Sequence, residues 1–369
     1  MMQLQGKRFW DRFDFPLFFV ALCITAIGLL NLNSATMSFT ENVTSPLFRS
    51  QVIYTVLGVF LMIGISFLRV KFLEAFAVWF YGASIFALVL VLVIGSQFKG
   101  SQSWIDFGFF RVQPSEFTKL GFILFFARYL AKQNHAHALG LKQLVVPFFI
   151  FLGPVLLIIL QGDLGTSLFF GFIFFSMVML QGVRFRLILV SVTLVVGLSV
   201  FSYFFLLKPY QQLRILSFMN PELDARGSGY HLVQSKIAVG SGELFGRGYL
   251  KGESNKLKYL PERHTDFVFP VLAQEWGFVG SSITLFFYFC LLMLGVRTMS
   301  RTQSQFPFFA SLGIVSLFFW HLVINLGGVL GLLPLTGVPL PLFSYGGSAL
   351  ITTWIGIGIL NAIYRDRFS

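Results

Sequence analysis

The sequence predicts an all-α integral membrane protein. Its apolar residues gather in runs of about twenty, the length that a helix needs to cross hydrocarbon. Of its 369 residues, 56% are hydrophobic and 11% are charged, and the mean hydropathy is +0.79. A water-soluble domain of this size could not cover so much apolar surface. The runs lack the short alternating pattern of transmembrane strands, so we expect helices, which satisfy their own backbone hydrogen bonds.

About ten candidate spans follow one another and form a single membrane domain over residues 1–369. The first follows Lys7, Arg8 and Arg12 and is similar to a signal peptide. Its length and the nine runs after it favour an uncleaved span. The eighth is long enough to contain a tilted helix or a broken one, and Pro270 would produce such a break. The spans are expected near 15–33, 51–68, 73–95, 116–131, 143–161, 164–181, 186–207, 267–296, 307–331 and 347–363.

The distribution of charge predicts the orientation of these spans. Basic residues concentrate at the span ends that share a side with both termini, whereas the opposite short loops carry only Arg49, Lys99 and Arg111. By the positive-inside rule both termini are cytoplasmic. Most carboxylates fall on the other side, so any chemistry is expected at the outer face. The net charge of +12 does not indicate nucleic acid, because no recognition motif accompanies the scattered basic residues.

One long polar loop, residues 208–265, separates spans seven and eight and is expected outside the cell. It contains many glycines but no Walker phosphate-binding motif, so nucleotide hydrolysis is not indicated. We expect short helices and turns there, partly re-entrant near Ser235. Four loop cations would suit a phosphate group, although any one of them alone is more often a solvated loop charge: Arg214, Lys236, Arg247 and Arg263.

Asp266 is the first candidate for a catalytic residue. It lies where the polar loop enters the eighth span, and partial desolvation of a carboxylate there would favour a general base. The alternative is a helix N-cap, which would satisfy free backbone N–H groups.

Two further segments place ionisable residues at span entrances. Gln113 or Ser115 would cap a helix opening at Pro114, and Glu116 and Lys119 would then be neighbours at i,i+3. That pair would line a cavity for an anionic substrate or serve as a structural ion pair. Asp163 occupies a short turn before the sixth span, where it would cap the helix or contribute to the same outer mouth.

The segment 331–348 carries Pro334, Pro339 and Pro341 together with several glycines, which forbid a regular helix. Irregular backbone at membrane depth must be covered by protein or line a watery cavity, and Ser344 in it is a candidate for substrate contact. No metal-ligand set is evident. The histidines are too far apart for a zinc site, and a divalent cation, Mg²⁺ or Mn²⁺, would be bound by carboxylates and phosphate oxygens.

Five segments, in order, resemble the family of shape, elongation, division and sporulation proteins, and the total length is more similar to the RodA branch than to the FtsW branch. They are QPSEFTK (113–119), GDLGT (162–166), GYHLVQSKIAVGSG (229–242), LPERHTDFVF (260–269) and GLLPLTGVPLPLFSYGGS (331–348).

This resemblance implies a peptidoglycan glycosyltransferase of the bacterial cytoplasmic membrane that polymerises lipid II during cell-wall elongation. Asp266 matches the family's essential aspartate, and Glu116 and Lys119 match positions that line its central cavity. The implied partners are lipid II and the growing lipid-linked glycan, a class B penicillin-binding protein transpeptidase and other membrane proteins of the elongation complex. Two alternatives stay open: a flippase for the lipid-linked precursor, or a non-enzymatic scaffold.

Overall fold

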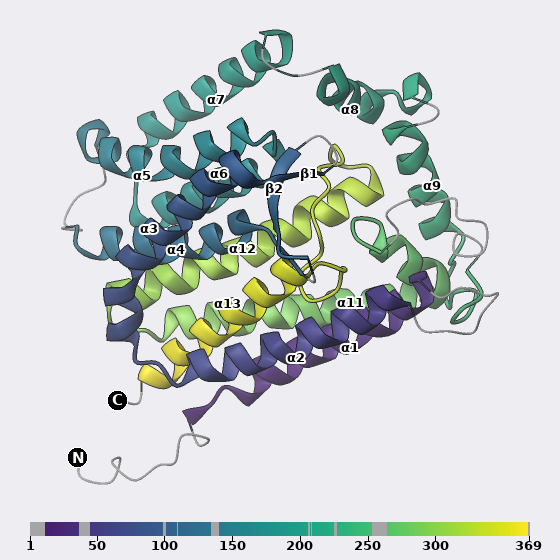
Figure 1. Cartoon of the computed structure of the whole chain (residues 1–369), viewed down its shortest axis with the longest axis horizontal. Helices are drawn as coiled ribbons and strands as arrows, with labels where there is room; N and C mark the ends of the chain where they lie inside the picture. The colour runs from purple at the N-terminus through teal and green to yellow at the C-terminus, as the bar shows by residue number, and fades with distance from the viewer. Residues whose placement is uncertain are drawn as a thin grey trace.

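The computed structural model describes residues 12–36, 45–98, 101–108, 110–133, 140–205, 207, 209–224, 227–252 and 264–367. Within them, ten long helices coincide with the ten predicted spans (Figure 1). They are α1 (Phe15–Thr36), α2 (Pro46–Ser66), α3 (Val70–Ile94), α4 (Pro114–Ala131), α5 (Leu141–Leu160), α6 (Leu164–Gln181), α7 (Phe185–Phe205), α11 (Val268–Ser300), α12 (Gln305–Leu330) and α13 (Gly347–Asp366). The predicted helical membrane fold is confirmed.

Eight of these helices in the described chain are long and apolar enough to cross a membrane. The exceptions are α4, which carries Glu116, Lys119 and Arg128, and α7. Most side chains of α4 are nevertheless buried against other helices, so protein rather than lipid surrounds its charged groups. The count of ten spans stays a prediction.

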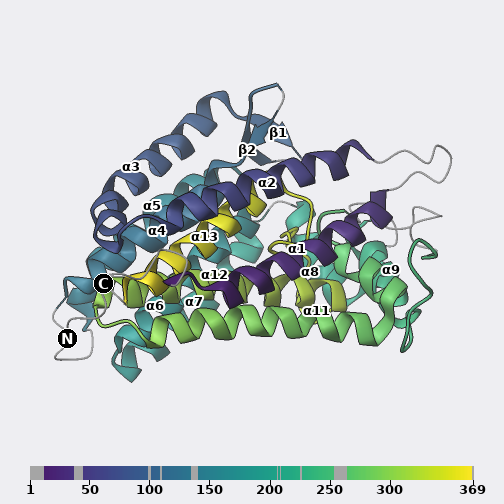
Figure 2. The same cartoon turned by 90° about the horizontal axis from the view of Figure 1, so that it is seen from below.

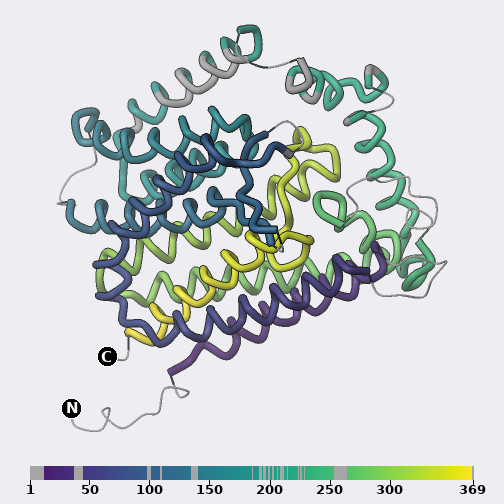
Figure 3. Tube along the Cα trace, viewed as in Figure 1, coloured from purple at the N-terminus to yellow at the C-terminus, as the bar shows by residue number. Residues whose placement is uncertain are grey.

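The buried helices α4 and α12 form the middle of the bundle. Helix α12 packs against α4, α6, α11 and α9, while α13 pairs with α2, and α1 pairs with α11. Figure 2 shows the same helices lying roughly alongside one another, and Figure 1 shows α7 at the edge of the bundle. In Figure 3, α13 (yellow) runs beside α2. The core therefore lies around two helices that also carry ionisable residues.

Both ends of the described chain meet at one end of the bundle. The Asp14 N–H, just before α1, donates to Asn361 Oδ1 near the end of α13 at 3.2 Å. The Asp14 carboxylate accepts two hydrogen bonds from Arg297 Nη2 of α11, at 2.8 and 2.6 Å. The helix ends of α1, α11 and α13 are thus tied together.

The predicted long loop contains short helices, as expected: α8 (Pro209–Met219), the 3-10 helix η2 (Pro221–Asp224) and α9 (Ser228–Gly240). Turns over 241–250 then fold back against α11, where the Arg247 and Gly248 N–H groups donate to the carbonyls of Gln274 and Glu275. The buried Glu275 side chain also contacts the Ser34 hydroxyl of α1. Residues 253–263 of the predicted loop lie outside the described residues.

The break in the eighth span is at Gly277, so the prediction of a break at Pro270 was wrong. Pro270 lies in the first turn of α11, where a missing N–H costs little. Gly277 has φ 65° and ψ −161°, and a Cβ there would lie 2.3 Å from Gly246 N. Only glycine permits both this backbone conformation and the close approach of the turn.

A small antiparallel sheet between α3 and α4 was not predicted. Its strands are β1 (Ser96–Phe98), β2 (Ser101–Asp106) and β3 (Arg111–Val112), in that order. The Gln102 N–H donates to Gln161 O at 2.8 Å, which fixes the sheet to the end of α5. The sheet places Arg111 directly before α4.

Candidate active site

A buried ion pair lies in the first turns of α4. Lys119 Nζ is 2.8 Å from Glu116 Oε1, and the two side chains are 2% and 7% exposed. Pro114 occupies the first turn of the helix, and the carboxylate of Glu116 lies at the positive end of the helix dipole. The predicted i,i+3 pair is confirmed.

The ammonium of Lys119 has two further neighbours in the core. His321 Nε2 of α12 lies 3.0 Å from Lys119 Nζ, and the Phe169 ring of α6 lies 5.1 Å from it. The rings of Phe169 and His321 are themselves 4.1 Å apart. One positive charge is thus held by a carboxylate, an imidazole and an aromatic face inside the protein.

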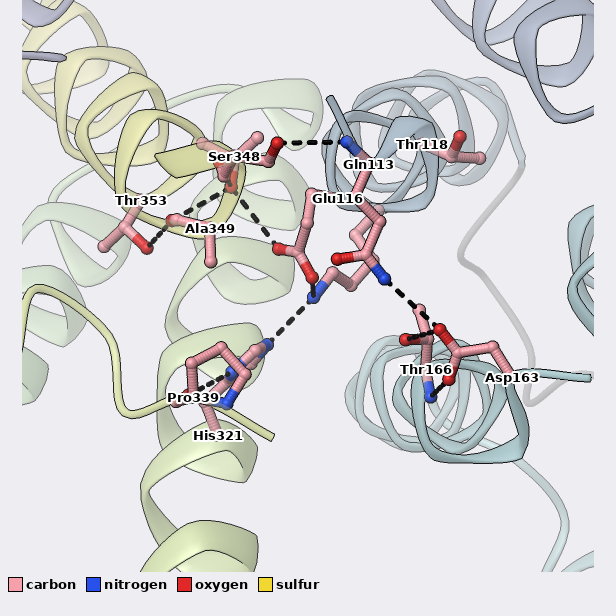
Figure 4. A network of polar contacts seen from close by, with 12 residues as sticks. Gln113, Glu116, Thr118, Asp163, Thr166, His321, Pro339, Ser348, Ala349 and Thr353 are labelled. Atoms are coloured by element: carbon pink, nitrogen blue, oxygen red, sulfur yellow. Dashed lines mark hydrogen bonds and ion pairs between the residues drawn. The ribbon is translucent and has the colours of Figure 1, made fainter. Parts of the chain in front are cut away.

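Helix α13 closes the other side of the pair (Figure 4). The Thr352 hydroxyl lies 3.5 Å from Glu116 Oε2, and the Ser348 hydroxyl accepts a hydrogen bond from the Gln113 N–H at 3.0 Å. These contacts join the start of α13 to the start of α4.

Asp163 caps α6, as one of its two predicted roles required. Its carboxylate accepts hydrogen bonds from the Thr166 N–H at 3.0 Å and the Thr166 hydroxyl at 2.8 Å. It also accepts one from Gln113 Nε2 at 3.2 Å. The prediction that a Gln113 or Ser115 side chain caps α4 was wrong, because α4 has no side-chain cap and the Gln113 amide contacts Asp163 instead.

Asp266 lies in the turn before α11, and Phe267 rather than Asp266 occupies the N-cap position. Its backbone carbonyl accepts a hydrogen bond from Asn325 Nδ2 of α12 at 3.2 Å. Its Oδ2 would lie 3.5 Å from a Cβ built on Gly337. The carboxylate therefore faces the irregular segment 331–346, which carries several of the motif residues.

That segment is irregular and largely covered, as predicted, with Val338, Leu340 and Phe343 buried. Ser344 is 3% exposed, and its hydroxyl accepts the Leu340 N–H at 2.8 Å. Gln51 of α2 donates to Ser344 O at 2.9 Å. The Ser344 hydroxyl thus closes a turn of the segment. Its contact with substrate stays a prediction.

Tyr345 joins this segment to the turn that carries Asp266. Its N–H donates to His264 O at 2.9 Å, and the two rings are 6.0 Å apart. Burial, with a smaller contribution from Tyr54, raises the pKa of the Tyr345 phenol, against the opposing effect of Arg111. The phenol therefore remains a neutral hydrogen-bonding group at neutral pH.

Arg111 is not part of the buried ion pair. Its Nε lies 2.8 Å from Asp106 Oδ2 across β2 and β3, and its side chain is 58% exposed. Hydrogen bonds from the Gly108 N–H and from Arg111 hold the pKa of Asp106 below its usual range. Arg111 thus presents a cation at the protein surface near Tyr345.

The four predicted loop cations have different places. Arg247, in the turn after α9, donates from Nε to Ser241 O at 3.2 Å. Lys236 in α9 lies over the C-terminal end of α12, where a Cβ at Gly331 would meet its ammonium, a favourable position for a cation at a helix dipole. Arg214 belongs to α8. Arg263 lies outside the described residues.

Two residues of this site were missed by the sequence analysis. His321 and Asn325 lie one turn apart on α12 and contact Lys119 and Asp266 respectively. The sequence signal that could have identified them is a pair of polar residues four positions apart within an apolar span, because such residues face the interior of the bundle.

No group of three or more His, Cys, Asp or Glu residues within the described chain is placed to hold a metal ion. Any divalent cation bound there would take its ligands from carboxylates and from phosphate oxygens of a substrate.

Comparison with known proteins decides the family. The model of a cell cycle protein family comprising FtsW, RodA and SpoVE matches residues 15–368. The chain belongs to this family. It is 37% identical over 361 residues to the peptidoglycan glycosyltransferase MrdB of Escherichia coli strain K12, which covers 98% of this chain and 96% of MrdB.

Two solved structures of family members resemble the fold. One, from a study of how a peptidoglycan synthase complex coordinates polymerization and crosslinking, has a TM-score of 0.83 at 32% identity, covering 96% of this chain and 98% of that one. The other, the rod shape determining protein RodA of Thermus thermophilus, has a TM-score of 0.73 at 32% identity, covering 98% and 99%. Family membership and the apolar helices identify an inner-membrane protein.

Proposed function

We infer that this chain is a peptidoglycan glycosyltransferase that polymerises lipid II into glycan strands, with Asp266 as its catalytic base. The kinship to MrdB supports the activity. The observation that carries the assignment of Asp266 is its placement: its carbonyl is held by Asn325 and its carboxylate faces Gly337. A base for a lipid-linked substrate requires a restrained carboxylate at the end of a membrane helix, so this placement supports the assignment.

The reaction requires a base and a means to accept negative charge. The 4-hydroxyl of the acceptor sugar attacks the anomeric carbon of the donor, and Asp266 takes the hydroxyl proton. The bond to the polyprenyl diphosphate breaks as the glycosidic bond forms, so the leaving group carries away the electron pair. A single displacement inverts the anomeric configuration.

Cations near the site would stabilise the departing diphosphate. Lys119 supplies a buried ammonium held at fixed distances by Glu116 and His321. Arg111 supplies an exposed guanidinium on β3. We propose that Lys119 provides the fixed positive charge of the site. Arg111 makes the first contact with an arriving anionic head group. Asp163, Arg214, Lys236, Arg263 and Ser344 stay as further substrate-contact proposals.

The orientation that fits this chemistry places both termini in the cytoplasm and Asp266 at the outer face. The tie between Asp14 and Asn361 supports a shared side for the termini, and basic residues crowd the helix ends there, among them Arg69, Lys71 and Arg301. The long loop 208–265 would then be extracytoplasmic.

The expected partners are a class B penicillin-binding protein, whose transpeptidase would cross-link the new strand, and other membrane proteins of the elongation complex. The likeness to a structure from a study of a peptidoglycan synthase complex supports this proposal.

The test is polymerisation by the purified chain, with and without its transpeptidase partner, supplied with lipid II in detergent. Wild type should yield glycan strands, and Asp266→Asn should yield almost none. Glu222→Gln, which alters an exposed carboxylate on η2, is the matched control and should remain active.

Three results would point elsewhere. No polymer from wild type with its partner would overturn the enzymatic function, and full activity of Asp266→Asn would overturn the assigned base. Movement of labelled lipid II across liposomes without new glycosidic bonds would favour the flippase alternative.

A further inference from the structure

Two residues of α12, His321 and Asn325, connect the buried ion pair of α4 to the turn that carries Asp266. They are four residues apart, so both side chains lie on one face of the helix. Each is 5% exposed. The face that they share is directed at the extended backbone around Val338 and Pro339. We call the pair the α12 clamp.

The clamp binds two consecutive carbonyl groups. His321 Nδ1 lies 3.2 Å from Pro339 O, and Asn325 Nδ2 donates to Val338 O at 2.7 Å. Residues 334–340 have no regular secondary structure, so these buried carbonyls depend on side chains for their hydrogen bonds. The clamp therefore fixes the height and direction of the segment along α12.

Asn325 uses its amide twice. The same Nδ2 that contacts Val338 also donates to the carbonyl of Asp266 at 3.2 Å. Two carbonyls can only accept, so the NH₂ group rather than the amide oxygen must face them. One side chain thus locks the turn before α11 against the segment that the Asp266 carboxylate faces.

His321 is similarly fixed by its two neighbours. Pro339 O can only accept a hydrogen bond, so Nδ1 carries the proton, and Nε2 then accepts from the Lys119 ammonium at 3.0 Å. A continuous hydrogen-bonded path results, from Glu116 through Lys119 and His321 to residues 338–339, and from there through Asn325 to Asp266.

We propose that His321 and Asn325 are positioning residues, which set the carboxylate of Asp266 relative to the ammonium of Lys119. The proposal rests on the glycosyltransferase function proposed above. Base and cation must act at opposite sides of one anomeric carbon, so their separation decides the rate. A displacement of about 1 Å in such a site can cost about a hundredfold in rate.

Each variant removes a different set of contacts made by the clamp. Asn325→Ala removes both amide hydrogen bonds. His321→Asn places its amide near the former Nδ1 and retains the bond to Pro339, whereas His321→Gln reaches the former Nε2 position and retains the contact with Lys119. Ser316→Ala is the control, since Ser316 is a buried polar residue of the same helix that lies about 140° around it from His321.

Kinetics with lipid II form the first arm of the test. We expect Asn325→Ala and both His321 variants to lower kcat by about tenfold to a hundredfold while KM changes less than about twofold, because the clamp acts on the reacting groups rather than on uniform binding. The double variant Asn325→Ala with His321→Gln should be less impaired than the product of the single effects, because both act on one segment.

Hydrogen–deuterium exchange without substrate forms the second arm. Asn325→Ala should raise exchange in residues 264–269 and 338–344, and Ser316→Ala should not. Unchanged exchange in Asn325→Ala would overturn the clamp. A rise in KM with an unchanged kcat in the clamp variants would overturn it as well. An inactive wild type would instead overturn the proposed function, and the exchange arm would still decide whether the clamp holds Asp266.

Discussion

Lys119 Nζ on α4 lies 3.0 Å from His321 Nε2 on α12, and 201 residues of chain separate the two side chains. The contact places an ammonium, a carboxylate and a neutral imidazole inside a membrane bundle, where the carboxylate and the imidazole are both hydrogen-bonding partners of the ammonium. Ionisable groups at such depth are costly unless they are paired.

The stability of the bundle should depend on keeping the ion pair whole. Lys119→Met leaves the Glu116 carboxylate buried beside apolar groups, and we expect it to lower the free energy of unfolding by about 3 kcal/mol. The double variant Glu116→Gln with Lys119→Met should recover much of that loss. Thermal unfolding in detergent measures both, and equal losses in the single and double variants would contradict a paired role. Polymerisation should fail in both.

The glycine at the break of α11 should be irreplaceable. Gly277→Ala adds a Cβ that collides with Gly246 N, at a residue whose φ is positive. The free energy of unfolding should therefore fall by more than about 2 kcal/mol. Gly82→Ala in α3 is the control, because a Cβ there meets nothing within 4 Å. Similar melting temperatures for the two variants would show that the turn 241–250 does not press on α11.

The tie at the terminal end of the bundle should contribute measurably. Asp14→Asn keeps an oxygen for the Leu17 N–H, which now bonds to Asp14 Oδ1, but removes the charge that Arg297 binds. We expect a loss of about 2 kcal/mol, seen as a lower melting temperature. Glu222→Gln, which removes an exposed carboxylate on η2, should melt like wild type, and if it melts as early as Asp14→Asn the effect is only one of net charge.

The hairpin that carries Arg111 should loosen in acid. The pKa of Asp106 is lowered in the folded chain, so the carboxylate stabilises the hairpin above its unfolded pKa, and this contribution disappears as pH falls through the folded value. Hydrogen exchange of residues 101–108, corrected for intrinsic rates, should rise below the usual Asp range. In Asp106→Asn the exchange should be independent of pH over that interval, and a pH response there would implicate another group.

Much of this architecture could be predicted because lipid imposes simple rules on sequence. Each long helix was found from the length of its apolar run, and the Glu116–Lys119 pair and the Asp163 cap from local spacing. The sheet was missed because β1 and β3 have three and two residues, too few for any alternation. The break at Gly277 was missed because a glycine leaves hydropathy unchanged, whereas Pro270 is conspicuous but harmless in a first turn.

The clamp could not be predicted for a different reason. In the sequence, His321 and Asn325 are two polar residues in an apolar helix. The neighbouring residues do not indicate which groups the two side chains contact. Their contacts join residues 202 and 59 positions apart, and they form only when α4, α11 and α12 pack. Tertiary packing, rather than spacing, defines this part of the site.

The meeting of Asp14 and Asn361 has a practical consequence. A dye attached to α1 near Asp14 and a second dye attached near the end of α13 would lie close together at the same end of the bundle. Doubly labelled chains could then be followed in living cells by energy transfer between the two dyes.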